Sequence, residues 1–377
     1  MHATISSSSV VRPTQVIVDL NILRDNFIAI KTASPGVHVM PILKANAYGH
    51  GLVRVAQTME QAGADLLGVA VLEEGLLLRE RGVSMPILVL GGILGNQIPD
   101  FIENNLILTA SSIDKLQQIE ATAGKMNKKA RVHLKFDTGM ERIGVHYYNA
   151  PSFILTADKC RHIEVEGIYS HFANADAPDL SHAQLQQRRF QQILSLYKAL
   201  RIPLPRYRHM ANSAAILRMP DAHFNLIRPG ILLYGVYPVA GEKRIQVQSA
   251  LTWKSSVVYF KVVKPGHPVG YGSTWESPHP VRAVTVPVGY GDGYFHAMSG
   301  KAEVLINGRS YPVVGRISMD QIVVNIEQDS AFNEDEVILL GRQNKREITA
   351  SDLARWAGTI PYEVLTNINT RVPRVYV

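Results

Sequence analysis

The stretch Pro41-Ile42-Leu43-Lys44-Ala45-Asn46-Ala47-Tyr48-Gly49-His50-Gly51 places a lysine at the end of an apolar run, directly before a polar turn that contains glycine. In a chain that alternates strands with helices, a strand ends and the mouth of an active site opens at such a point. Partial burial of a lysine amine favours the neutral form, which can condense with an aldehyde. Tyr48 is near enough to offer its hydroxyl to the same ligand. A solvated lysine at a strand end is the alternative that spacing alone allows.

Eight short apolar runs, most of them separated by helical patterns, extend outward from this stretch. They are Val37–Leu43, Ala64–Val71, Pro86–Leu90, Leu106–Thr109, Ala130–Phe136, Ile163–Tyr169, Arg206–Met210 and Phe224–Arg228. The helical patterns include one capped by Asp19 after Val16–Val18, and Leu52–Ala62, Leu72–Arg81, Ile113–Met126 and His182–Leu200. Eight strands alternating with helices predict a (β/α)8 barrel, which we assign to residues 1–244. A doubly wound sheet is the alternative, but no early glycine-rich phosphate fingerprint supports it.

From about residue 245 the pattern changes to strands with few helices. The expected strands are Leu251–Val262, Ala283–Val288, Glu303–Ile306, Gln321–Ile326 and Glu336–Leu340. Asn307-Gly308 predicts a hairpin turn. Only Ala350–Ala357 is expected to be helical, with Thr349 or Ser351 as its cap. We therefore predict a mostly β domain over residues 245–377.

Composition narrows the classes of function. The net charge of +7 comes from 39 basic and 32 acidic side chains that are scattered along the 377 residues, so it favours anionic small molecules and not nucleic acid. The single cysteine, Cys160, excludes an intrachain disulfide and fits the reducing cytoplasm. Met1–Gln15 lacks the apolar core of a secretory signal, and no stretch is long enough to span a membrane.

Polar groups follow five of the expected barrel strands. They are Lys44, Asp137–Arg142, His171, His209–Ser213 and Arg228–Ile231. Because barrel enzymes build their sites at these strand ends, we expect the groups to converge, with a phosphate site after strands seven and eight. There the Ser213 hydroxyl and the backbone amides of Gly230 and Ile231 are the expected donors. The alternatives are ordinary rim charges for Lys135 and Arg142, a core histidine for His171, and an N-cap for Ser213 before the helix Ala214–Arg218.

The second domain supplies a tyrosine, Tyr271, between two glycines that expose its hydroxyl; a packed turn aromatic is the alternative. Three further motifs are Pro287–Gly293, Gly315–Asp320 and Pro361–Glu363. Gly291-Asp292-Gly293 lacks the oxygen ligands of a calcium loop, and no His/Cys cluster has zinc spacing, so no metal is expected. Gly289–Gly293 does not follow the strand of a βαβ unit, which argues against dinucleotide binding.

From about Thr14 to Arg374, the order and spacing of these motifs resemble those of alanine racemases. That family implies a pyridoxal phosphate (PLP) enzyme with a barrel, a β domain and a homodimer whose active sites are shared between subunits. The resemblance implies that Lys44 is the Schiff-base lysine and one catalytic base, and that Tyr271 of the partner subunit is the opposite base. It implies the following further cofactor contacts: Tyr48, His171, Asn212, Ser213, Arg228, Gly230, Ile231 and Tyr362.

In the same way, Arg142 and Met319 would meet the substrate carboxylate, and Tyr290 and Asp320 would lie around the substrate and its entrance. Lys135 matches a lysine that many family members carbamylate. Ser318 departs from members that carry cysteine there, which leaves the chemistry intact. Two alternative functions stay open: a relative on the same scaffold, such as a serine or basic amino-acid racemase or a decarboxylase, and a non-catalytic PLP-binding module. Tyr271 and the second domain favour a racemase over both.

Overall fold

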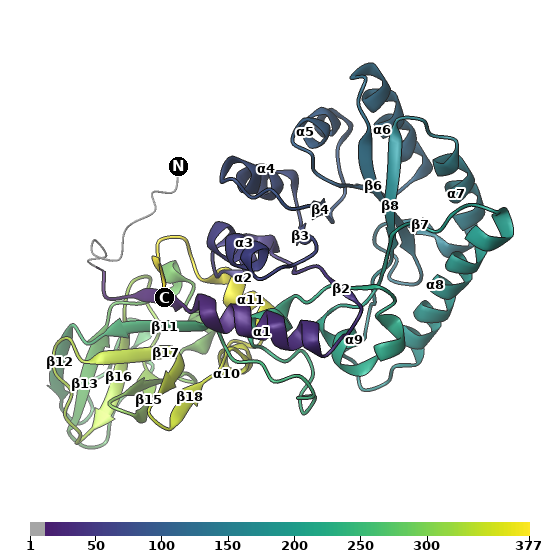
Figure 1. Ribbon diagram of the computed structural model, residues 1–377. Coiled ribbons are helices and arrows are strands. Elements are labelled where there is room, and N and C mark those ends of the chain that lie inside the picture. The colour runs from purple at the N-terminus through teal and green to yellow at the C-terminus, as the bar shows by residue number, and fades with distance from the viewer. Residues whose placement is uncertain (1–11) are drawn as a thin grey trace. The chain divides into compact units, whose positions relative to one another are not determined.

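The computed structural model describes residues 12–377, which divide into two compact units (Figure 1). The barrel unit comprises Leu23–Ala47 and Gly51–Gln248. The β unit comprises the described residues through Ile22, then Tyr48–His50 and Ser249–Val377. The expectation about a secretory signal concerns Met1–Gln15, most of which lies outside the described residues. The domain boundary after residue 244 stays a prediction.

The barrel unit contains nine strands and most of the helices. Its strands are β2 (His38–Val39), β3 (Leu67–Val69), β4 (Ile87–Val89), β5 (Leu108–Ala110), β6 (Ala130–Asp137), β7 (Val145–His146), β8 (Ile163–Tyr169), β9 (Tyr207–His209) and β10 (Leu226–Ile227). Its helices are α1 (Leu20–Thr32, which begins in the β unit), α2 (Lys44–Tyr48, which ends there), α3 (Leu52–Gln61), α4 (Leu72–Glu80), α5 (Ile98–Glu103), α6 (Ile113–Lys125), α7 (Ala150–Asp158), α8 (Ser181–Leu200) and α9 (Ser213–Arg218). Short 3-10 turns are η2 (Gly95–Gln97), η3 (Tyr147–Asn149), η4 (Pro220–Ala222) and η5 (Ile231–Tyr234).

Eight of these strands form a closed parallel ring, which confirms the predicted barrel. One sheet runs in the order β2-β10-β9-β8-β6-β5, and β3 pairs with β4. Parallel bridges between Ile42 and Gly68 and between Leu88 and Ile107 join the two pieces at both ends. Each predicted apolar run overlaps one strand of the ring, and β5 and β6 each end one residue beyond their runs. The ninth strand, β7, was not predicted. It comes after the turn that follows β6, and β6 is the strand with which it pairs.

The barrel helices are amphipathic, as a helix packed on a sheet requires. In α3 the buried residues Leu52, Val55, Ala56 and Met59 recur at helical spacing. In α1 the amides of Asn21 and Ile22 bind the Asp19 carboxylate, which confirms Asp19 as the cap. Figure 1 shows the helices α3 to α8 around the outside of the strands, so that strand ends and their loops remain for a site.

The β unit is built on one long, mostly antiparallel sheet. Its strands are β1 (Gln15–Val18), β11 (Leu251–Ser256), β12 (Tyr259–Val263), β13 (Val281–Val286), β14 (Glu303–Ile306), β15 (Arg309–Val314), β16 (Ile322–Glu327), β17 (Glu336–Gln343), β18 (Arg346–Ile348) and β19 (Arg374–Tyr376). The order is β12-β13-β16-β15-β14-β17-β11-β1-β19, with β18 on β17. The remaining elements are η6 (Tyr271–Ser273), η7 (Tyr290–Asp292), η8 (His296–Met298), α10 (Ala350–Ala357) and α11 (Pro361–Asn367).

Two expectations for the β unit were wrong. Leu251–Val262 is not one strand. The Val257 amide donates to the carbonyl oxygen of Asp335, whereas the Val258 amide donates to that of Thr285. The chain therefore changes its pairing partner at this point, and β11 and β12 lie apart in the sheet. α11 was not expected, because only Ala350–Ala357 was predicted to be helical in this unit; its Pro361 stands in the first turn, where proline is favoured. The Asn307-Gly308 hairpin and the Thr349 cap of α10 are confirmed.

Candidate active site

Lys44 follows the bridge at Ile42 that closes the ring, and it begins a turn of unusual backbone. Ala45, Asn46 and Ala47 have φ values of 54°, 55° and 52°. Left-handed conformations are unfavourable for residues with a Cβ, and such strain gathers at functional sites. Side chains hold the turn: Glu74 accepts from the Ala45 amide at 2.6 Å, and Asn46 accepts from the Leu52 amide at 2.8 Å. The lysine therefore leaves the strand in a fixed direction.

The Lys44 amine stands in a positive environment. Although the residue keeps exposed surface, partial burial lowers the pKa of its amine, and the charges of Arg142 and Arg228 lower it further, against the opposing charge of Glu74. A lowered pKa increases the fraction of neutral amine near neutral pH. The neutral amine is the form that attacks a carbonyl or takes up a proton.

Arg228, at the end of β10, is buried and held from several sides. Its Nη2 lies 2.9 Å from the Ser170 carbonyl oxygen, 3.1 Å from the Met210 carbonyl oxygen and 3.0 Å from His171 Nδ1. Its Nη1 lies 2.6 Å from His209 Nδ1. Burial lowers the pKa of Arg228 to about 10, so the guanidinium keeps its charge near neutral pH. The result is a fixed cation at the strand ends.

Lys135 and His171 lie close to this cation, and both have lowered pKa values. Burial, then the charges of Arg228 and Arg142, hold the pKa of Lys135 well below its usual value, with Asp137 opposing. The Lys135 Nζ sits 4.7 Å from the centre of the Tyr169 ring. Burial, then the charge of Arg228, holds the pKa of His171 well below its usual value too. Lys135, Arg142 and His171 line one narrow recess.

The turn that carries Arg142 is wrapped around the carboxylate of Asp137. The amides of Gly139 and Met140 donate to its Oδ1 at 2.7 and 2.9 Å, and the Arg142 amide donates to its Oδ2 at 3.2 Å. Burial opposes ionisation, but these amides lower the pKa of Asp137 below its usual value. Asp137 thus fixes the backbone of Arg142, a role that the sequence did not reveal.

A set of backbone donors converges where α9 and η5 begin. The Ser213 hydroxyl oxygen accepts from the amides of Gly230 at 2.9 Å and Leu232 at 3.3 Å, so its own proton is free to point elsewhere. The Gly230 amide is therefore already engaged here. The Ile231 and Ser213 amides have no acceptor among residues 12–377. Asn212, and not Ser213, is the N-cap of α9, accepting from Ala215 at 3.0 Å.

In the β unit, Tyr271 lies on a turn between Gly270 and Gly272, whose φ values are 75° and 72°, and 73% of its surface is exposed. The Arg316 guanidinium packs against Gly272: a Cβ atom added to Gly272 would lie 3.0 Å from the central carbon of the guanidinium. The tyrosine is therefore presented outward, with a cation against its turn. Its predicted exposure is confirmed.

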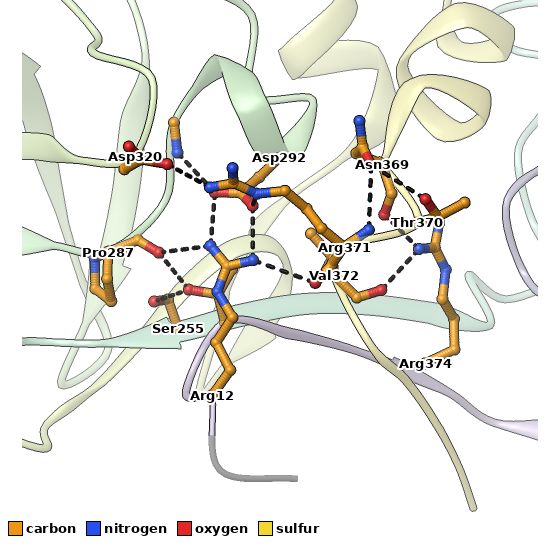
Figure 2. A network of polar contacts seen from close by, with 12 residues as sticks. Arg12, Ser255, Pro287, Asp292, Asp320, Asn369, Thr370, Arg371, Val372 and Arg374 are labelled. Carbon is orange, nitrogen blue, oxygen red and sulfur yellow. Dashed lines mark hydrogen bonds and ion pairs between the residues drawn. The ribbon is translucent and has the colours of Figure 1, made fainter. Parts of the chain in front are cut away.

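Tyr290, Met319 and Asp320 lie on two loops of the β unit that are tied together. The amide of Tyr290 donates to Ser318, and that of Gly291 donates to Met319. Figure 2 shows the side-chain network behind them: the buried Asp292 carboxylate contacts Arg12 at 2.7 Å and Arg371 at 2.6 Å, and Arg371 also contacts Asp320 at 2.5 Å. Asp292 thus anchors both loops.

Tyr362, on α11, lies near Tyr48 in the β unit, with ring centres 6.1 Å apart. Tyr48 is almost completely buried, and burial followed by the neighbouring Tyr362 raises the pKa of its phenol above the usual value. Tyr48 therefore stays a neutral phenol that can donate one proton to a ligand.

Replacing Asp292 with asparagine is expected to destabilise the protein by about 1.5–3 kcal/mol at neutral pH, the range for hydrogen bonds to a charged group. Burial opposes ionisation, but Arg12 and Arg371 lower the pKa of this carboxyl below its usual value. A lowered pKa stabilises the fold above the unfolded-state value of about 3.9, and the contribution is lost as the pH falls through the folded-state value. Denaturant unfolding at several pH values measures both effects.

The control is Asp329→Asn, which removes an exposed ion pair with Arg309. That change should cost less than about 1 kcal/mol, because exposed pairs contribute little. Equal losses for the two variants would contradict the anchoring role of Asp292.

The barrel unit thus gathers Lys44, Lys135, His171, Arg228 and Ser213 around its strand ends, as predicted. Two further histidines join this group: His209 contacts Arg228 directly, and His133 contacts His209. The sequence placed His209 at a strand end without a role of its own and did not single out His133. The sequence did contain a signal for His133. It stands two residues before Lys135 on β6, and because side chains alternate along a strand, the two residues share one face. Within residues 12–377 no group of three or more metal-binding side chains is present. None of the helices in that range is both long and apolar enough to cross a bilayer.

Comparison with known proteins gives a consistent match over both units. Residues 18–238 match the alanine racemase N-terminal domain, and residues 250–376 match the alanine racemase C-terminal domain. An alanine racemase from Carboxydothermus hydrogenoformans is 42% identical over 369 residues, covering 97% of this chain and 100% of the relative. The alanine racemase structure from Clostridium difficile 630 superposes with a TM-score of 0.92 at 36% identity, covering 98% and 97% of the two chains. A complex of that protein with cycloserine superposes with a TM-score of 0.90 at 34% identity, covering 98% and 96%.

Proposed function

The chain belongs to the alanine racemase family, and from that premise we propose that it interconverts L-alanine and D-alanine with PLP as cofactor. The observation that carries the proposal is the position of Lys44, a lysine of lowered pKa at a barrel strand end, inside a full-length family match. The relatives' names favour neither a serine racemase nor a non-catalytic PLP-binding module. We further propose a cytoplasmic enzyme that supplies D-alanine for peptidoglycan.

The residues of the barrel unit fit the cofactor. The unpaired amides of Ser213 and Ile231 and the free proton of the Ser213 hydroxyl would hold a phosphate, as helix N-termini commonly do. Lys44 would bind the aldehyde carbon, and Arg228 would face the ring nitrogen. Asn212 would support the loop that carries Ser213. The family resemblance also assigns to the phosphate two phenol groups of the β unit, those of Tyr48 and Tyr362. When bound, PLP would supply the electron sink that makes the Cα–H bond of an amino acid acidic.

Two bases on opposite faces of Cα would perform the inversion. Lys44 would hold or release a proton on one face, because its lowered pKa favours the neutral amine that can take one up. Tyr271 of the partner subunit would do the same on the other face. Arg142 and Met319 would fix the substrate carboxylate, while Tyr290 and Asp320 would surround the entrance. Arg228 would remain protonated and would not give its proton to the ring nitrogen, since its pKa is about 10.

Lys135 would act by positioning Arg142 and not by transferring a proton. Its amine is buried and its pKa is held well below the usual value, which favours the neutral form that reacts with carbon dioxide. We propose that it becomes carbamylated. The resulting negative charge would face the cations Arg142 and Arg228, and it would hold Arg142 toward the substrate.

A chiral assay of the purified protein against all common L-amino acids tests the proposed activity. We expect conversion of L-alanine to an equal mixture of the enantiomers, and little or no conversion of bulkier substrates. Faster racemisation of serine or of a basic amino acid would reassign the substrate. A failure to racemise any amino acid with saturating PLP would reject the proposal.

Borohydride treatment of the yellow, PLP-loaded protein is expected to fix the cofactor covalently on one peptide, the one that contains Lys44. The reason is that Lys44 is the lysine with a lowered pKa at the strand-end turn, whereas the Lys135 amine is enclosed. Peptide mapping by mass spectrometry measures the label. Lys135→Ala is the control and should still be labelled at Lys44; label on another lysine would contradict the assignment.

A further inference from the structure

A line of buried side chains leads from Arg228 to a histidine that takes no part in the proposed reaction. Nη1 of Arg228 lies 2.6 Å from Nδ1 of His209, and Nε2 of His209 lies 2.9 Å from Nδ1 of His133. His133 and His209 have no exposed surface, and Arg228 has almost none. The three side chains come from β6, β9 and the end of β10. They form one continuous hydrogen-bond chain.

The chemistry of these three side chains determines which nitrogen atoms of the hydrogen-bond chain carry the protons. Guanidinium nitrogens only donate, so Nδ1 of His209 must accept. Burial, followed by the charge of Arg228, holds the pKa of His209 well below its usual value, and burial lowers the pKa of His133 to about 3. Both rings are therefore neutral near pH 7, with one proton each. The proton of His209 is on Nε2 and is donated to Nδ1 of His133, whose own proton is on Nε2.

The rings have little freedom to rearrange. His209 stacks on Tyr169 with centres 4.8 Å apart and planes 3° apart, and the Tyr169 hydroxyl is bound to Thr109 at 2.8 Å. His133 packs against Gly167, where a Cβ would lie 2.6 Å from the ring. Nε2 of His133 is buried and has no partner among residues 12–377. An unpaired buried N–H is costly, so a purely apolar residue would suit this place better if the only need were packing.

We propose that His133 is a positioning residue, which supplies the acceptor that keeps His209 in its Nε2–H tautomer and so keeps Nδ1 available to hold Arg228. Without that acceptor, the Nε2–H of His209 is left unpaired. The other tautomer would direct an N–H at the Arg228 guanidinium, and the two donors would repel each other. The tautomers follow from hydrogen-bond geometry alone, whereas the effect on catalysis rests on the proposed function, in which Arg228 faces the cofactor ring.

The test compares His133→Asn with His133→Leu, two side chains of nearly equal size. The asparagine oxygen can accept from His209 Nε2, and leucine cannot. In the PLP-loaded protein labelled with ¹⁵N-histidine, NMR should show a protonated Nε2 and an unprotonated Nδ1 for His209 in the wild type and in His133→Asn. The leucine variant should lose this pattern. Its kcat for alanine should be about tenfold lower than that of the asparagine variant, in the range seen for residues that orient a ligand's contacts. KM should stay similar, because His133 touches no substrate group.

Two results would overturn the proposal: a wild-type His209 protonated on Nδ1, or equal changes of spectrum and kcat in the two variants. If the leucine variant does not fold, the wild-type and asparagine spectra still decide the tautomer. A wild-type protein without racemase activity would reject the proposed function, while the ¹⁵N spectra would continue to report on the hydrogen-bond chain. The two failures are therefore distinguishable.

Discussion

Tyr271→Phe is expected to lower kcat/KM for racemisation about 10²–10⁴-fold, the usual loss for one general acid–base group. The two enantiomers have equal free energies, so the loss must be the same in both directions. Tyr271 is exposed on the β unit between two glycines, beside the Arg316 guanidinium, and the proposed mechanism uses its hydroxyl on the face opposite Lys44. Chiral chromatography of the products measures the loss.

The same variant separates proton exchange from inversion. In deuterated water it should still exchange the Cα proton of D-alanine, because by family resemblance Lys44 faces that side. L-alanine should exchange slowly, since its proton points at the missing hydroxyl. NMR of Cα deuteration follows each enantiomer, and Tyr259→Phe on the exposed part of β12 is the control that should behave as wild type. Equal exchange of both enantiomers, or retained racemisation, would show that Tyr271 is not the second base.

Mixing two inactive variants, Lys44→Ala and Tyr271→Ala, should restore activity once their subunits exchange. In a dimer with shared sites, one of the two sites in each mixed dimer receives an intact lysine from one chain and an intact tyrosine from the other. Activity should approach about half that of a wild-type dimer, by the symmetry of a closed dimer. Native mass spectrometry establishes exchange, and a racemase assay measures the recovery.

The control is the double variant Lys44→Ala/Tyr271→Ala exchanged with wild type. If sites are shared, every site in the mixed dimer lacks one base and the mixed dimer is inactive. If each site uses both bases of one chain, the mixed dimer keeps half of its activity and the two single variants never complement. The pair of mixtures therefore gives opposite results for the two arrangements.

The barrel could be predicted because its strands are buried on both faces and appear in the sequence as continuous apolar runs. Lys44, His171 and Arg228 could be located because they end such runs. The place where β11 gives way to β12 could not, because apolar residues continue across Val257 and Val258 and only their partners change.

The roles of His133, His209 and Asp137 were missed for a related reason. Each acts through a contact with a group distant in sequence or with the backbone of its own turn, and neither kind of contact leaves a local pattern. His133 and His209 meet across the sheet although 76 positions separate them. A single sequence reports which residues end strands, but it does not report which buried polar side chains find each other.

Strand β1 lies between β11 and β19, so its partners are residues 251–254 on one side and 374–376 on the other. Both partners are distant in the sequence, so no local contact can pair β1, and each pairing must first close a long loop. Until both loops have closed, β1 offers an unpaired strand edge of the kind that invites aggregation. We therefore expect the β unit to complete its sheet late in folding, and refolding at high protein concentration should lose material to aggregation at this step.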